Sequence, residues 1–285
     1  MTAPEEAERE GRAAARKFRT DNGLGVGPLG DLVALIEQTC GVDVTMLAID
    51  DADEHGLTMV DPARGAAIVA VACSDRPMRW RSNLAHELGH LVLGDHDSGQ
   101  PGRLTADPFV EQRARAFARH VLVPVDGISR MRDNARGART QSADHPGLAL
   151  LSDVVQHFQA SPRIVTIQLR DLGLIDDALF AEWSSVDTPA LAARFGWTDQ
   201  YATLQHASRQ HRAPQRLLTR AVAGYIAGLV SLETVASVRG VTPHDLALEF
   251  EAAGIAPAAA IPQPEEDEFP DPAGVDIDLS WLDDE

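Results

Sequence analysis

Apolar residues follow helical spacing in the segment "PLGDLVALIEQTCG" (28–41) and gather in short runs after it. The leucines and Ile36 of this segment recur every three to four positions, which predicts an amphipathic helix that ends at Gly41. Three short runs bounded by Asp-rich and Pro/Gly turns then predict a small, mainly antiparallel sheet. The runs are "VDVTMLAI" (42–49), "GLTMV" (56–60) and "AAIVAVACS" (66–74).

Two further amphipathic helices are predicted after the sheet. The first contains "LAHELGHLVLG" (84–94), with Ser82 as its expected N-cap and the final glycine as its expected stop. The second is "PFVEQRARAFARHVL" (108–122), which ends just before a proline.

Residues 148–175, and the chain from about residue 188 to residue 256, are predicted to be helical. "LALLSDVVQHF" and "PRIVTIQLRDLGLI" form a helical pair within 148–175, and Ser161 followed by Pro162 marks the start of its second helix. Beyond Ala256 the Pro, Ala, Glu and Asp content is typical of disorder. We therefore divide the chain into an N-terminal lead (1–24), an α+β domain (25–180), a helical C-terminal domain (188–256) and an acidic disordered tail (257–285).

Most of the negative charge lies in the tail. The formal net charge is −18, and residues 265–285 hold ten acidic residues and no basic one, which leaves −8 for the other 264. A body that is itself acidic is a poor general partner for nucleic acid, since phosphate contacts depend on clustered Lys and Arg, so direct nucleic-acid binding is not expected. The N-terminus has no apolar signal segment and no run reaches the ~18 apolar residues of a membrane span, so we expect a cytoplasmic protein without a membrane partner.

The stretch "LAHELGHLVLGDH" (84–96) places two histidines four residues apart, with a glutamate directly after the first. On a helix, His86 and His90 project from one face, and two neutral imidazoles suit one tetrahedral zinc ion. Glu87 occupies the position from which a carboxylate reaches a water at that ion and acts as general base. The expected reaction is amide hydrolysis. The alternative is a surface helix with two solvated histidines.

A catalytic zinc takes three protein ligands, so two histidines are too few. Glu111 is the best candidate for the third, because it lies on the first turn of the next helix and shares a face with the small residues Ala114 and Ala118. Its alternative role is to stabilise the helix N-terminus through the macrodipole. The other candidates for the third ligand are Asp95, His96, Asp97, Asp107 and His120.

Two motifs together resemble the ImmA/IrrE family of zinc metallopeptidases. They are "LAHELGHLVLGD" and "EQRARAFARHVLVP", the second of the form E-x-x-A-x-x-F-A-x-x-x-L-x-P. The resemblance also covers the preceding strands and the helical pair, which is roughly residues 25–175. Two features depart from the family: residues 1–24 are too short for the helix-turn-helix domain that some members carry, and Arg115 stands where the motif often has Asn.

The resemblance implies a zincin-like fold and one Zn²⁺ per chain, held by His86, His90 and Glu111, with Glu87 as the catalytic base and acid. It implies a metallo-endopeptidase whose protein substrate is a helix-turn-helix repressor. Cleavage or inactivation of that repressor would release genes of a mobile element or of a stress response. No functional residue is implied for residues 190–285.

Two other functions are consistent with the sequence. A DNA-binding regulator would use residues 148–175 or 231–254 as helix-turn-helix units, although their second helices carry few basic residues. A binding module would hold a repressor at the zinc site without cutting it, and the sequence does not identify the donor that would stabilise an oxyanion.

The acidic tail carries a separate prediction. The segment "VDIDLSWLDD" (275–284) alternates apolar and mostly acidic residues, a pattern that can add as a strand to a sheet edge. We therefore expect residues 264–285 to dock on the protein itself or on a partner. The alternative is a tail that only increases solubility.

Overall fold

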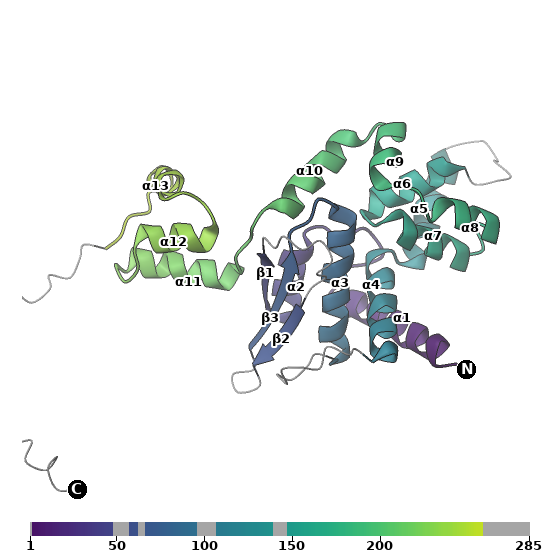
Figure 1. Ribbon diagram of the computed structural model, residues 1–285, viewed down its shortest axis with the longest axis horizontal. Helices are drawn as coiled ribbons and strands as arrows, with labels where there is room; N and C mark the ends of the chain where they lie inside the picture. The colour runs from purple at the N-terminus through teal and green to yellow at the C-terminus, as the bar shows by residue number, and fades with distance from the viewer. Residues whose placement is uncertain (1, 48–56, 62–65, 96–106, 139–146, 259–285) are drawn as a thin grey trace, which may run out of the picture. The chain divides into compact units, whose positions relative to one another are not determined.

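The chain divides into two compact units, Met1–Leu218 and Thr219–Glu285, and each is considered by itself. The computed structural model describes residues 2–47, 57–61, 66–95, 107–138 and 147–258 (Figure 1). The first ten helices and the three strands belong to the first unit: α1 (Ala3–Asp21), α2 (Leu32–Cys40), β1 (Asp43–Leu47), β2 (Leu57–Asp61), β3 (Ala66–Ala72), α3 (Pro77–Leu93), α4 (Pro108–Leu122), α5 (Val125–Ala138), α6 (Leu148–Phe158), α7 (Pro162–Asp171), α8 (Asp177–Trp183), α9 (Thr188–Phe195) and α10 (Thr198–Arg209). Within the described ranges, no helix has the length and apolar character of a membrane span.

The three strands form a mixed sheet in the order β1-β3-β2. The central strand β3 pairs antiparallel with β2 but parallel with β1, so the sheet is not mainly antiparallel as the sequence suggested. A short apolar run predicts a strand, but it does not report the direction of the neighbouring strand. The predicted α+β class is confirmed.

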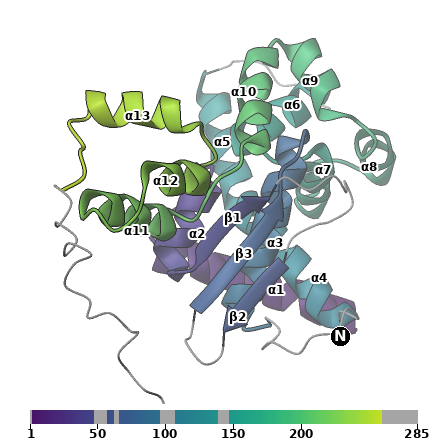
Figure 2. The same cartoon turned by 60° about the vertical axis from the view of Figure 1, so that its left-hand side comes forward.

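One face of the sheet is covered by helices (Figure 2). Helix α3 packs against β2 and β3, and α2 packs against β1. Val44 and Met46 of β1 and Val69 and Val71 of β3 are buried on this face. Thr58 on β2 is in register with Val69, so its side chain also lies on the inner face, toward α3.

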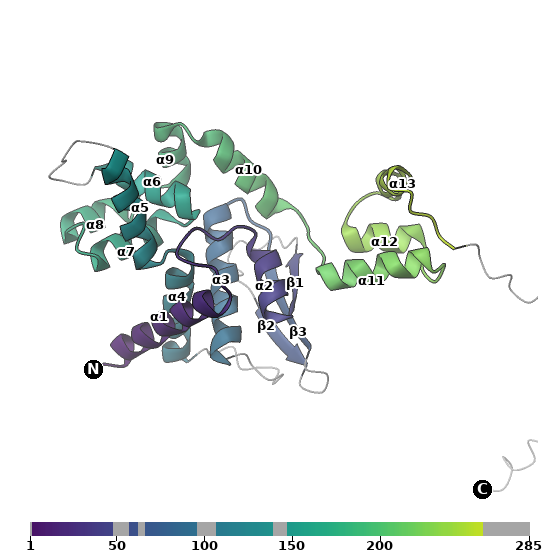
Figure 3. The same ribbon diagram turned by 180° about the vertical axis from the view of Figure 1, so that it is seen from behind.

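Residues that were expected to form a lead instead form α1, a 19-residue helix that contributes to the core. Ala15 and Phe18 belong to the same hydrophobic cluster as Phe117 of α4. Helix α1 crosses α4 (Figure 3) at Gly11, where a Cβ atom would lie only 2.4 Å from the carbonyl oxygen of Arg113. The buried face of α1 consists mostly of small residues, and charged residues surround them in the sequence. The sequence pattern therefore does not indicate that this helix is part of the core.

The predicted helices are present, with one clear shift at an end. Helix α3 begins at Pro77, and Ser82 lies inside it and donates its hydroxyl to the carbonyl oxygen of Met78 instead of capping the helix. Helix α4 has the predicted bounds. The second helix of the pair, α7, begins at Pro162 behind the predicted cap Ser161.

Helices α9 and α10 belong to the first unit, whereas the sequence grouped them with the C-terminal helices from residue 188 onward. Leu191 and Trp197 lie in the same hydrophobic cluster as the sheet and α3. The indole N–H of Trp197 donates a 3.0 Å hydrogen bond to the hydroxyl of Ser152 on α6. The compact units therefore divide after Leu218, because these apolar side chains complete the first core.

The second unit contains most of α11 (Gln215–Ile226), together with α12 (Leu232–Arg239) and α13 (Pro243–Ala252). Its buried residues include Val235 and Phe250, and the Phe250 ring contacts Tyr225 with centroids 5.2 Å apart. The predicted acidic tail (257–285) lies outside the described residues from position 259 onward, and the predicted docking of residues 264–285 therefore stays a prediction.

Candidate metal centre

His86 and His90 lie on one face of α3, on consecutive turns. Their Nε2 atoms are 3.1 Å apart, and their rings meet edge to face with centroids 4.7 Å apart. The helix takes this orientation because Leu84 and Leu88, on its other side, are fully buried in the core. Both imidazoles therefore point to one position beside α3.

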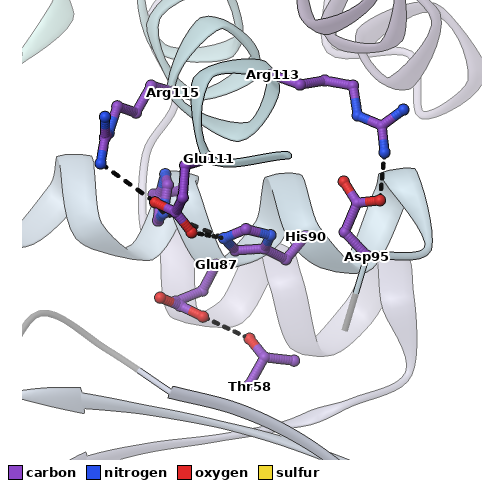
Figure 4. A network of polar contacts seen from close by, with 8 residues as sticks. Thr58, Glu87, His90, Asp95, Glu111, Arg113 and Arg115 are labelled. Atoms are coloured by element: carbon purple, nitrogen blue, oxygen red, sulfur yellow. Dashed lines mark hydrogen bonds and ion pairs between the residues drawn. The ribbon is translucent and has the colours of Figure 1, made fainter. Parts of the chain in front are cut away.

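Glu111, on the first turn of α4, points to the same position (Figure 4). Its Oε2 atom lies 3.3 Å from Nε2 of His86, and its Oε1 atom lies 3.4 Å from Nε2 of His90. One ligand atom from each of the three residues lies within 4.8 Å of the others. Asp107, a competing candidate, instead caps α4 by accepting a 2.9 Å hydrogen bond from the backbone N–H of Phe109.

Helices α3 and α4 approach each other closely because small residues line their contact. A Cβ atom on Gly89 would lie 3.2 Å from both the carbonyl oxygen of Ala114 and the Cδ1 atom of Phe117. Ala114 and Ala118, which the sequence placed on the face of Glu111, are both buried. The glycine on α3 therefore determines how near Glu111 comes to the two histidines.

Glu87 extends from α3 toward the sheet, on a different side of the helix from Glu111 (Figure 4). Its side chain is buried, with 5% of the residue exposed, and its Oε2 atom accepts a 2.7 Å hydrogen bond from the hydroxyl of Thr58. The sequence analysis did not single out Thr58, because its position depends on the register of β2 beside Val69. A charge-assisted bond of this kind fixes the direction of the carboxylate.

The spacing of the three side chains fits a zinc ion. Ligand atoms ~2.0–2.1 Å from a tetrahedral zinc lie about 3.3 Å from one another. The two Nε2 atoms are 3.1 Å apart, and the two oxygens of Glu111 lie close to this spacing, Oε2 at 3.3 Å from His86 and Oε1 at 3.4 Å from His90. Two imidazoles and one carboxylate are also a donor set of catalytic zinc sites, which keep a fourth position open. The residues present are therefore suited to hold the ion.

The remaining candidates for the third ligand have other partners. Asp95 pairs with Arg113 at the end of α3 (Figure 4). His120 is buried, and its Nε2 atom lies 2.8 Å from the carboxylate of Glu8 while its Nδ1 atom lies 3.1 Å from the amide nitrogen of Gln168. His96 and Asp97 lie outside the described residues.

Two arginines of α4 lie on either side of the site (Figure 4). Arg115 places Nη2 3.3 Å from Oε2 of Glu111, but its side chain is 71% exposed, so solvent screens the pair. Arg113 is mostly buried and joins α4 to Asp95 and, at 2.9 Å, to Glu10 of α1. The buried arginine therefore holds α1, α3 and α4 together, whereas the exposed one only borders the site.

The fold and this site together define a metallopeptidase-type domain, in which a helix carrying two histidines meets a carboxylate from the next helix in front of a small sheet. Residues 37–169 match the family model of peptidase M78, described as the IrrE N-terminal-like domain. The resemblance to this family that the sequence predicted is therefore confirmed over these residues. A search of curated proteins found no match.

Proposed function

We propose that this protein is a zinc-dependent metallo-endopeptidase whose zinc is held by His86, His90 and Glu111. The observation that carries the proposal is the convergence of the two Nε2 atoms and the Glu111 carboxylate on one position, with Glu87 beside them but not part of the group. Structural zinc sites use four protein ligands. Among the described residues no fourth His, Cys, Asp or Glu joins this group, as expected for a site that admits water and substrate.

Glu87 is proposed to transfer protons in the reaction. When bound, zinc polarises a peptide carbonyl and makes water at the site more acidic. The carboxylate of Glu87 then accepts the proton of the attacking water and delivers it to the leaving amine. The hydrogen bond from Thr58 supports this role, because a carboxylate that transfers a proton must keep a fixed direction.

We further propose that the substrate is a helix-turn-helix repressor, which this protein cleaves or inactivates. The support comes from the family: residues 37–169 are an IrrE N-terminal-like domain, and the ImmA/IrrE proteins that the sequence resembles act on such repressors. The acidic body of the chain also favours a protein substrate over a nucleic acid.

The test combines metal content with cleavage. Wild type, Glu87→Gln and His90→Ala are purified, their zinc is measured by mass spectrometry, and each is incubated with the repressor encoded beside the gene. We expect one equivalent of zinc in wild type and Glu87→Gln, and cleavage by wild type alone. Cleavage by Glu87→Gln would contradict the role of Glu87, and full zinc in His90→Ala would contradict the metal site.

The same material separates the two alternative functions. A binding module would retain the repressor on zinc-loaded wild type without producing fragments. A DNA-binding regulator would bind DNA at physiological salt and lose that binding when Arg163 and Arg170 are replaced. The guanidinium of Arg170 lies 3.8 Å from the centroid of the Phe180 ring, so this arginine already has a stacking partner within the protein itself.

A further inference from the structure

A cavity of about 340 Å³ lies beside α1, and none of the metal-site residues lines it. Its walls come from α1, from the turn that follows this helix and from the junction of α4 and α5. Its volume falls in the range of ~300–1,000 Å³ that is usual for small-molecule sites. The polar side chains in its lining are Arg12, Arg16, Arg19, Thr20, His120 and Asp126.

The lining of this cavity is basic. Arg12, Arg16 and Arg19 follow one face of α1 at helical spacing and bring three guanidinium groups, whereas the lining includes a single carboxylate, Asp126. Asp126 lies 3.7 Å from Arg16, and both side chains are 66% exposed, so their attraction is weak. In a protein with a formal net charge of −18, this is a local excess of positive charge in a concave site, which concentrates anions.

Arg19 is buried among backbone carbonyls. Its Nε atom donates to the carbonyl oxygen of Val121 at 2.8 Å, and its Nη1 atom donates to those of Gly25 and Gly27 at 2.8 and 3.0 Å. The residue is only 4% exposed, and its Nη2 atom has no hydrogen-bond partner among the described residues. Burial lowers the pKa of Arg19 to about 10, so the guanidinium stays charged at neutral pH.

Arg81 provides an internal comparison. It is equally buried and also binds backbone carbonyls, but Nε, Nη1 and Nη2 all have partners and the residue does not line the cavity. Arg19 therefore differs by an unsatisfied donor and by its place at a basic cavity. A buried cation without a carboxylate partner is unfavourable unless an anion compensates its charge.

We propose that this cavity binds a small ligand through a phosphate group, with Arg12 and Arg16 in contact with the phosphate and the buried charge of Arg19 behind them. Guanidinium groups match phosphate geometry and bind it through paired hydrogen bonds. The inference does not depend on the proposed peptidase activity, since the site shares no residue with the metal centre.

The experiment is titration calorimetry of the full-length protein with inorganic phosphate and, separately, with adenosine monophosphate. We expect saturable binding of at least one of the two. Tighter binding of the nucleotide would show that the cavity also contacts the organic part, and equal affinity would assign recognition to the phosphate alone. The double variant Arg12→Gln/Arg16→Gln should weaken binding by about 10-fold or more, because both charge-assisted contacts are lost.

The control is Arg163→Gln on α7, which removes one exposed positive charge from the same unit away from the cavity. Since Arg12 and Arg16 are themselves exposed, all variants should fold, and circular dichroism checks this. Absence of saturable binding of either compound would overturn the proposal. Full affinity in the double variant, or an equal loss in Arg163→Gln, would also overturn it.

Discussion

Thr58 on β2 donates a 2.7 Å hydrogen bond to Glu87 on α3, so the sheet contacts the helix at the proposed proton-transfer residue. Helices α3 and α4 alone bring together His86, His90 and Glu111. The sheet adds Thr58, the hydrogen-bond donor that orients the side chain of Glu87. The site therefore depends on two separate contacts, one between helices and one between a helix and a strand.

Replacing Thr58 by Val tests the contact between strand and helix. The variant removes the hydroxyl donor from a buried carboxylate, so kcat should fall by about 10- to 100-fold while KM and zinc content stay near wild type. The conservative Thr58→Ser variant keeps the donor and should retain most of the activity. An unchanged kcat in Thr58→Val would show that Glu87 does not need this partner.

Replacing Gly89 by Ala tests the contact between the helices. A Cβ atom there meets Ala114 and Phe117 at 3.2 Å, so we expect the free energy of unfolding to fall by ~1–3 kcal/mol. Alanine itself favours a helix over glycine by ~1 kcal/mol, so a net loss would mean that steric overlap dominates. Zinc affinity should fall too, because Glu111 is displaced.

The matched control for Gly89→Ala is Gly30→Ala, where a Cβ atom would meet nothing within 4 Å. Urea unfolding and a zinc titration should leave this control near wild type. A Gly89→Ala variant that is more stable than wild type and binds zinc equally well would contradict the close helix contact.

Glu111 and Arg115 form an ion pair in which only one member is proposed to bind metal. Glu111→Ala should lower zinc affinity by more than the ~10- to 100-fold that the loss of outer-shell partners causes. Arg115→Gln should change it by less than about 3-fold, because the side chain is 71% exposed and its charge is screened. Competition with a zinc-binding dye measures both. Equal losses would mean that the arginine organises the site.

The parts of the site that the sequence could predict are local ones. His86, Glu87 and His90 follow from spacing within one helix, and the approach of Glu111 could be inferred from the small residues of its own helix face. Thr58 could not be inferred, because its place depends on strand register across a segment far away in the sequence.

The same distinction applies to the fold. The bounds of α4 and the start of α7 were predictable, because caps and prolines mark helix ends locally. The parallel pairing of β1 with β3, the burial of α1 and the division after Leu218 were not. Each of these depends on which apolar faces meet in the folded chain, and periodicity alone does not report that.

Glu8 on α1 links this helix to Arg119 and His120 of α4. Burial raises the pKa of Glu8, but hydrogen bonds from His120 and Arg119 outweigh burial and lower the pKa from 4.5 to about 2. A pKa below the unfolded value means that the ionised carboxylate stabilises the fold above pH 4.5, and that this contribution is lost as the pH falls toward 2. Because the side chain is 35% exposed, solvent screens these interactions and limits the expected contribution to ~1 kcal/mol.

Urea unfolding of wild type and Glu8→Gln across this pH range measures the contribution of Glu8. The variant should be less stable than wild type by ~1 kcal/mol at about pH 7, and the two should converge as the pH approaches about 2. Glu182→Gln, on the exposed surface of α8, controls for the loss of one negative charge and should keep the wild-type pH dependence. Parallel curves for wild type and Glu8→Gln would mean that the link between α1 and α4 contributes no pH-dependent stability.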